Sequence, residues 1–197
     1  MTDGPMIYLA SASPRRRELL TQLGLRFETL PSNVLEEQRA GEPPEEYVLR
    51  VAVDKARFVA RLIAERGLPV WPVLGVDTEV VLDDEVLGKP RDRDHAVTML
   101  RRLSGRSHRV LSALCVVHGA DEHTAISESE VTFCALSHAQ IQRYWETGEP
   151  ADKAGGYAVQ GRAAGFIERL DGSYSGVMGL PLYELAELLR KAGIDWP

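Results

Sequence analysis

The sequence predicts an α/β fold with a mixed β-sheet, in a single domain over residues 1–197. Short apolar runs typical of strands alternate with segments in which apolar residues recur at helical spacing. Two long strand-like segments, 110–117 and 126–136, are consecutive and can pair as a hairpin across residues 119–124. The 197 residues, 44% hydrophobic and 26% charged, suit a globular chain that buries ~70% of its unfolded surface.

The N-terminal third should contain one strand and two helices. Residues 6–10 form a short apolar strand, and Ser13 then takes the N-cap position of a helix that Gly24 ends. The polar segment 31–44 is expected to be an irregular loop, and the best candidate for a mobile one. A longer amphipathic helix follows over residues 45–65.

The middle of the chain adds a second apolar strand and a third helix. Residues 73–82 form an apolar run, and the acidic pair 83–84 turns the chain back into a short strand over 85–87. Asp92 is placed to cap a helix that Gly105 ends.

Beyond the predicted hairpin, the pattern gives two helices and a strand. Ser137 and Gln140 have the capping-box spacing at the start of a helix. A glycine-rich stretch leads into a strand through residues 166–167. Residues 180–181 open a last amphipathic helix, which Gly193 ends.

Composition excludes several classes of protein. The chain has 23 Lys and Arg against 29 Asp and Glu, a net charge of −6, which argues against a general affinity for nucleic acid. No apolar run approaches the ~18 residues of a membrane span, and Met1–Pro5 has no character of a signal peptide. Cys115 and Cys134 are too few for a disulfide scaffold, so we expect reduced thiols and a cytoplasmic protein.

The start of the first predicted helix violates a local preference. Arg15, Arg16 and Arg17 lie in its first turn, where positive charge opposes the helix dipole at ~0.3–1 kcal/mol each. Ser11 and Ser13 place hydroxyl groups beside the same free N–H groups. This combination indicates an anion-binding site that uses Arg15 and Arg16. The alternative is a solvated basic turn, which is our interpretation of Arg17.

Two further charged residues lie in apolar surroundings. Lys55 falls on the apolar stripe of its helix, so it either extends to the edge or points at a negative group inside a cleft. Asp77 interrupts the apolar strand 73–82, where an unpartnered carboxylate is costly to bury. Because ligands bind at strand ends in α/β proteins, we interpret Asp77 as a catalytic or metal-binding residue; the alternative is a buried structural ion pair.

Three weaker signals accompany these residues. Lys89 follows Gly88 after a strand, and the segment 153–161 places glycines around a lysine and Gln160, whose amide can bind the edge of a base. Glu36 and Glu37, in the irregular loop, could join Asp77 around a divalent ion, or they could be ordinary polar residues of a loop. No Walker, GxGxxG or zinc spacing is present. Together the residues indicate phosphate chemistry.

Blocks of residues in chain order resemble the Maf-like nucleoside triphosphate pyrophosphatases. The blocks are 9–16 (LASASPRR), Glu36, Lys55, 75–78 (GVDT), 87–90 (LGKP), 103–106 (LSGR), 152–161 (DKAGGYAVQG) and 177–181 (VMGLP). The resemblance implies an elongated mixed sheet flanked by helices, with two lobes and a central cleft, related to the inosine triphosphatase (Maf/Ham1) fold and often dimeric. It implies hydrolysis of a nucleoside triphosphate between the α and β phosphates, with Mg²⁺ or Mn²⁺.

Carried onto this sequence, the resemblance assigns roles to four residues. Asp77 matches the proton acceptor, and Arg15, Thr78 and Gln160 match the positions associated with base choice. The branch that resembles dTTP/UTP pyrophosphatases has Arg, Thr and Gln there, whereas an aromatic residue commonly replaces the arginine in the 7-methyl-GTP branch. The resemblance therefore favours the pyrimidine branch.

Charge considerations complete the expected site. Leu35 stands where many relatives have an aspartate, which leaves Glu36 as the loop ligand of the metal beside Asp77. Lys55 and Lys89 would hold the β and γ phosphates. The nucleotide would be held by the start of the first helix through Ser11, Ser13, Arg15 and Arg16.

Two other functions are compatible with these residues. The enzyme could prefer 7-methyl-GTP or another modified nucleotide. Alternatively, the protein could be a nucleotide-binding regulator of cell division or septum formation, a process with which the resembling family has been linked. The expected partners are a nucleoside triphosphate and a second copy of the chain, without stable nucleic acid or membrane contact.

Overall fold

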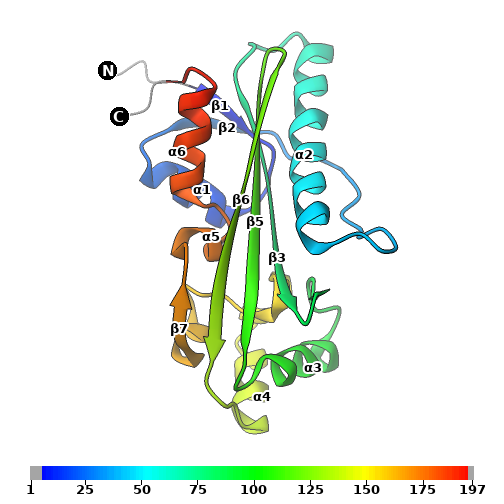
Figure 1. Cartoon of the computed structure of the whole chain (residues 1–197), viewed down its shortest axis with the longest axis vertical. Helices are drawn as coiled ribbons and strands as arrows, with labels where there is room; N and C mark the ends of the chain where they lie inside the picture. The colour runs from blue at the N-terminus through cyan, green and yellow to red at the C-terminus, as the bar shows by residue number, and fades with distance from the viewer. Residues whose placement is uncertain (1–5, 195–197) are drawn as a thin grey trace.

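Long antiparallel strands run along the longest axis of the molecule (Figure 1). The structure is a computed structural model that describes residues 6–194, so the segment Met1–Pro5 lies outside the described residues. Seven strands form one sheet in the order β2-β1-β3-β5-β6-β7, with β4 paired to β3. They are β1 (Met6–Leu9), β2 (Arg26–Thr29), β3 (Val73–Leu82), β4 (Glu85–Val86), β5 (Ser107–His118), β6 (Asp121–Phe133) and β7 (Ile167–Asp171).

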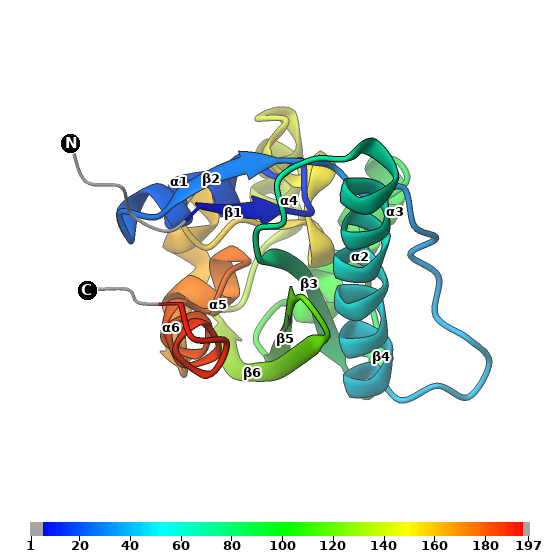
Figure 2. The same cartoon turned by 90° about the horizontal axis from the view of Figure 1, so that it is seen from above.

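The sheet is mixed, as the sequence predicts. Strand β1 is parallel to β2 and β3, and the other pairs are antiparallel. The helices are α1 (Pro14–Gln22), α2 (Pro44–Arg66), α3 (Arg93–Leu103), α4 (His138–Glu146), α5 (Tyr174–Met178) and α6 (Leu182–Lys191), with short 3₁₀ turns at Glu149–Asp152, Ala154–Gly156 and Arg162–Phe166. Seen from above, α2 and α6 lie on opposite sides of the strands (Figure 2). None of the helices within residues 6–194 has the length and apolar character needed to cross a bilayer.

Side-chain caps fix two helix starts where the sequence predicts them. Asp92 accepts a hydrogen bond from the His95 amide at 2.8 Å. Ser137 and Gln140 form a complete capping box at α4. Ser13 occupies the predicted N-cap of α1 but makes no side-chain cap bond there. The sequence prediction was therefore right about its position and wrong about its role as a hydrogen-bonding cap.

Some boundaries differ from the predicted ones. The hairpin between β5 and β6 is closed by Gly119 and Ala120, because His118 already pairs with Asp121. The polar residues that begin β6 were predicted as loop, yet they continue the ladder on an exposed face, and the strand ends at Phe133. Neither β2 nor α5 was predicted, since each is only four or five residues long.

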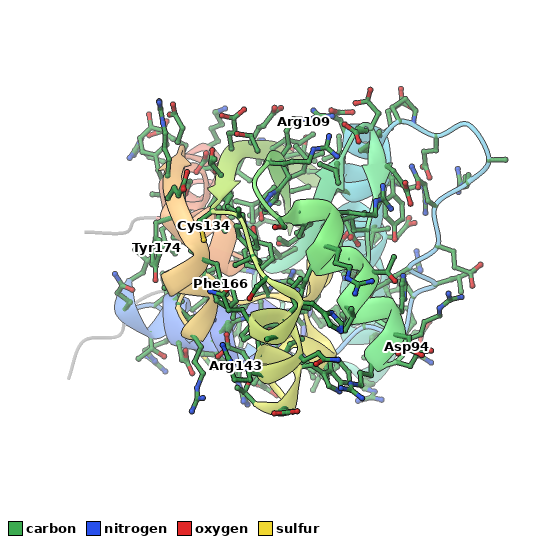
Figure 3. All side chains as sticks on the ribbon, turned by 90° about the horizontal axis from the view of Figure 1, so that it is seen from below. Asp94, Arg109, Cys134, Arg143, Phe166 and Tyr174 are labelled. Carbon is green, nitrogen blue, oxygen red and sulfur yellow. The ribbon has the colours of Figure 1, made fainter. Side chains whose placement is uncertain are left out.

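Buried apolar residues form three clusters on the sheet. The α6 cluster lies between the sheet and helices α1 and α6, the α2 cluster lies under α2, and the α3 cluster fills the far end with α3 and α4. Figure 3 looks at that far end and shows Phe166 among the segments that cover it and Asp94 on the outer side of α3. Members include Ile7, Leu20, Leu114 and Leu188 (α6 cluster), Ala52, Val59, Leu111 and Ala113 (α2 cluster), and Leu100, Phe133, Ile141 and Ala163 (α3 cluster).

Helix α2 lies directly on the backbone of β3. A Cβ atom at Gly75 would lie 2.1 Å from the Ala52 carbonyl oxygen and 2.7 Å from the Ala56 nitrogen. Only glycine permits this approach, since any side chain would push the helix away. Lys55 lies between those two alanines in the chain, so the contact also fixes the distance of Lys55 from the strand.

Candidate functional site

A cavity of about 410 Å³ opens beside the middle of β3. On this edge β1 pairs with β3 only as far as Leu74, and β4 begins to pair at Val81. Among residues 6–194 no strand covers the edge between them, so both faces of β3 contribute side chains to the cavity. The strand presents Asp77 and Glu79 on one face and Thr78 on the other, because side chains alternate along a strand.

The α1 wall of the cavity is held by Arg16. Its guanidinium donates to the Gly179 carbonyl at 2.9 Å, to Ser11 Oγ at 3.0 Å and to Thr78 Oγ1 at 3.4 Å. Burial lowers the pKa of Arg16, and the charges of Asp77 and Glu36 oppose that effect. Arg16 therefore joins the start of α1 to β3 and to the turn after α5.

Thr78 belongs to a short hydrogen-bond chain below Arg16. Ser112 Oγ lies 2.8 Å from Thr78 Oγ1 and 2.7 Å from the Gly176 carbonyl, to which it donates. Because the Ser112 hydroxyl has one hydrogen, Thr78 donates to Ser112 and accepts from Arg16. Ser112 is fully buried and was not predicted as a site residue.

On the α2 side, Lys55 bridges two carboxylates. Its Nζ lies 2.8 Å from Asp77 Oδ1 and 2.9 Å from Glu36 Oε1. Lys55 and Asp77 are both buried, whereas the Glu36 side chain is 44% exposed. Of the two alternatives for Lys55, the structure shows the one in which the amine points at negative groups inside a cleft. The ion pair anticipated as the alternative for Asp77 also exists, but its members line the cavity.

The backbone near Glu36 is fixed by the same helix. Tyr47, in the first turn of α2, donates its hydroxyl to the Glu36 carbonyl at 3.1 Å. The predicted loop 31–44 is irregular as far as residue 43, and this hydrogen bond attaches the middle of the loop, at Glu36, to α2.

Glu79 is a site residue that the sequence interpretation missed. Its side chain is 8% exposed and lines the cavity, and Oε2 has no hydrogen-bond partner. Burial, with the neighbouring charge of Asp77, raises the pKa of Glu79 to about 8. The signal was present in the sequence, since a residue two positions from Asp77 in a strand shares its face.

The opposite wall comes from the segments around Lys89 and 152–160. The Gly155 amide donates to the Gly88 carbonyl at 2.7 Å, which joins the two segments. Gly155 has a φ of +67°, and a Cβ there would lie 2.9 Å from Val80 Cγ1, so a side chain would both strain the backbone and contact β3. Lys89 and Gln160 are exposed at the rim of the cavity.

A buried histidine supports this wall from below. His108 Nε2 and the Tyr157 hydroxyl lie 2.8 Å apart, and the two rings pack edge-to-face. Burial lowers the pKa of His108 to about 4. His108 is therefore neutral near pH 7 and fixes the ring of Tyr157, whose side chain lines the cavity.

All ten predicted site residues line this one cavity. They are Ser11, Ser13, Arg15, Arg16, Glu36, Lys55, Asp77, Thr78, Lys89 and Gln160. Arg17 is exposed and outside the lining, as expected for a solvated residue. One expectation was wrong: Asp77 lies in the middle of β3, not at a strand end, and it is accessible because the neighbouring strand β1 stops short.

The donor atoms of the cavity suit a hard divalent cation. Asp77 Oδ2 and Glu79 Oε2 are buried carboxylate oxygens without a hydrogen-bond partner. Carboxylate oxygens are the protein ligands that Mg²⁺ and Mn²⁺ favour. Within residues 6–194 no three acidic, histidine or cysteine side chains are already grouped as a metal site. The cavity thus offers part of a coordination sphere.

Comparison with known proteins agrees with the sequence resemblance. The profile of the family described as "Maf-like protein" matches residues 6–192. The chain belongs to the Maf-like family. It is 54% identical over 193 residues to a protein of Alkalilimnicola ehrlichii named dTTP/UTP pyrophosphatase, covering 98% of this chain and 95% of that protein.

Other Maf-like relatives carry the same name. Proteins of Burkholderia pseudomallei and Bordetella avium named dTTP/UTP pyrophosphatase are each 52% identical to this chain, covering 96% and 100% of it and 95% and 100% of their own lengths. Among solved structures, the Staphylococcus aureus Ham1 protein aligns with 65% of this chain and 71% of its own, at 13% identity and a TM-score of 0.46.

Proposed function

We propose that this Maf-like protein hydrolyses dTTP and UTP to the monophosphate and pyrophosphate. The observation that supports this most is that one cavity is lined by Asp77, Arg15, Thr78 and Gln160. The Asp77 carboxylate in it has one oxygen without a hydrogen-bond partner. Arg15, Thr78 and Gln160 match the pyrimidine branch of the family. Relatives with 52–54% identity over nearly the whole chain carry the name of this activity.

Charge supports a triphosphate as the occupant. Five basic side chains line the cavity: Arg15, Arg16, Lys55, Lys89 and Lys153. Four carboxylic acids line it too: Glu36, Asp77, Glu79 and Asp152. With all nine groups ionised, five positive and four negative charges leave only +1. A triphosphate brings about four negative charges, so the proposal includes a divalent cation, Mg²⁺ or Mn²⁺.

In the proposed reaction, Asp77 accepts a proton from water. The water oxygen forms a bond to the α-phosphorus, the bond from that phosphorus to the α–β bridging oxygen breaks, and pyrophosphate leaves. Lys55 holds Asp77 Oδ1, which leaves the two lone pairs of Oδ2 available, one for the water and one for a cation. Lys55 and Lys89 offset the charge of the departing pyrophosphate.

Asp77 and Glu36 would hold the cation. When bound, it supplies positive charge to the phosphate oxygens. Residues at the start of α1 would make the remaining contacts with the nucleotide, and Gln160 at the rim would bind the edge of the base. Arg16 already donates a hydrogen bond to Thr78, so this one of the three base-choice residues is positioned before the nucleotide binds.

A substrate panel tests this proposal. Purified protein is incubated with Mg²⁺ or Mn²⁺ and with dTTP, UTP, CTP, GTP or 7-methyl-GTP, and products are identified by ³¹P NMR. The expected products are pyrophosphate with dTMP or UMP, and little product from purines. Preferred turnover of 7-methyl-GTP would contradict the specificity, and orthophosphate as first product would contradict the bond that is cleaved. No turnover of any substrate would contradict the enzymatic function.

A further inference from the structure

Glu79 is an acidic side chain in the cavity that the mechanism above does not use. Glu79 is only 8% exposed, and its Oε2 atom has no hydrogen-bond partner. A buried carboxyl group without a partner is costly and is therefore rare outside functional sites. The presence of this unpartnered carboxyl group therefore requires either a ligand or a structural explanation.

The nearest basic groups do not supply that partner. Lys55 is within 3 Å of both Asp77 and Glu36, and no hydrogen bond or ion pair joins it to Glu79 among the described residues. Lys89 lies at the rim and is exposed. The charges that surround Glu79 thus leave Oε2 available.

Asp77 and Glu79 are placed to bind one ion. They lie two residues apart on the same face of β3, so their Cα atoms are about 7 Å apart. Each has one buried carboxylate oxygen without a partner, Oδ2 and Oε2. The Gly75 contact with α2 keeps this face of β3 close to Lys55, which holds the other Asp77 oxygen.

We propose that Glu79 is a ligand of the divalent cation in this cavity, together with Asp77. Carboxylate ligands, here Asp77 and Glu79 beside the proposed loop ligand Glu36, combine with water and substrate phosphates in the coordination spheres that Mg²⁺ commonly takes and Mn²⁺ accepts. This inference rests on the proposed function, which makes the cavity the site of a cation-dependent nucleotide hydrolase. If Glu79 had only a structural role, a neutral side chain of the same shape would serve equally well at this position.

Mn²⁺ binding measured by electron paramagnetic resonance tests this without turnover. The full-length protein is titrated with Mn²⁺ alone, and again with α,β-methylene-UTP present. Glu79→Gln keeps the shape but removes the charge, and we expect it to weaken Mn²⁺ binding at least about tenfold. Glu168→Gln, an exposed residue of β7, removes the same charge outside the cavity and should bind as the wild type does. Circular dichroism checks that each variant is folded.

Glu79→Asp separates ligation from charge. It keeps the negative charge but withdraws the oxygen by one methylene, so we expect weaker Mn²⁺ binding than in the wild type. Wild-type affinity in Glu79→Gln, with and without the analogue, would overturn the proposal. Wild-type affinity in Glu79→Asp would also overturn it, because charge alone would then suffice.

The two proposals fail in different ways. If Glu79→Gln binds Mn²⁺ normally while the wild type releases pyrophosphate from dTTP, the ligand role is wrong and the proposed function stands. If Glu79→Gln loses Mn²⁺ but the wild type hydrolyses no nucleotide, the ligand role stands and the proposed function is wrong.

Discussion

Lys55 Nζ lies 2.8 Å from Asp77 Oδ1, and both side chains are buried although the residues are 22 positions apart in the chain. The lysine comes from α2 and the aspartate from the middle of β3. The pair fixes one oxygen of Asp77 and leaves the other without a partner. The same contact thus stabilises the fold and orients the group to which we assign proton transfer.

Asp77→Asn should abolish turnover and preserve the fold. The amide oxygen can still accept from Lys55, and Glu36 still partners the lysine, but the amide cannot accept a proton from water. We expect pyrophosphate release to fall at least about 100-fold, with an unchanged circular dichroism spectrum. A folded variant that keeps most of the wild-type rate would rule out the role of Asp77.

Lys55→Met should destabilise the protein more than Asp77→Asn does. Removing the lysine leaves a buried aspartate without its cation, and breaking a buried pair in this way costs about 3–5 kcal/mol. Urea denaturation measures the loss in free energy of unfolding. In the double variant with Asp77→Asn, the loss should be smaller than the sum of the two single losses. Strict additivity would show that the pair contributes no coupling energy.

Gln160→Ala should weaken use of dTTP and UTP without affecting stability. Gln160 is exposed at the cavity rim, so its loss leaves no gap in a core, but the proposed contact with the base edge disappears. One such hydrogen bond corresponds to a decrease in kcat/KM of about tenfold. Gln22→Ala, on the exposed end of α1, is the control and should retain wild-type kinetics. Equal kinetics for both variants would show that Gln160 does not contribute to binding of the base.

The buried His108 should make stability fall in mild acid. Its pKa is about 4 in the folded protein and about 6.5 when unfolded, so between these values the unfolded chain binds more protons. The free energy of unfolding should therefore decrease as the pH falls from 6.5 to 4, by at most about 3 kcal/mol from this residue. Urea denaturation across this range, compared with the non-titrating His108→Gln variant, isolates the contribution. Parallel pH profiles for the two proteins would contradict the prediction.

Gly75→Ala should reduce both stability and activity. The new Cβ would overlap the Ala52 carbonyl oxygen, so α2 must move away from β3 and carry Lys55 with it. Overpacking of this kind costs about 1–3 kcal/mol. Gly165→Ala has open space around its Cβ and an ordinary φ, so it serves as the control in thermal denaturation and turnover assays. Similar melting temperatures for the two variants would show that α2 does not depend on the contact.

Much of the site could be predicted because its residues violate local preferences. Arg15 and Arg16 at the start of α1, a lysine on an apolar stripe and an aspartate in an apolar strand are each unfavourable in isolation, and each lines the cavity. The sequence could not decide whether Lys55 reaches solvent or a carboxylate. That choice depends on the contact between α2 and Gly75, which joins segments distant in the chain.

Glu79 shows the other limit of prediction. Its position two residues after Asp77 put it on the same strand face, but its access to the cavity depends on where β1 stops and β4 begins. Ser112 likewise acquires its role only through the pairing of β5 with β3, which brings its hydroxyl to Thr78. The strand β2 was missed because it has only four residues, none of them fully buried, which is too short a segment to establish a period.

The continuity of the central strands determines how the protein can move. Strands β3 and β5 carry residues of all three clusters, including Leu74, Val80 and Val81 of β3, without a break in their pairing. A rigid rotation of one end against the other would have to bend or twist this ladder, which has no flexible linker within it. Nucleotide access therefore depends on side chains and on the loops at the cavity rim, and the overall dimensions of the molecule should be the same with and without nucleotide.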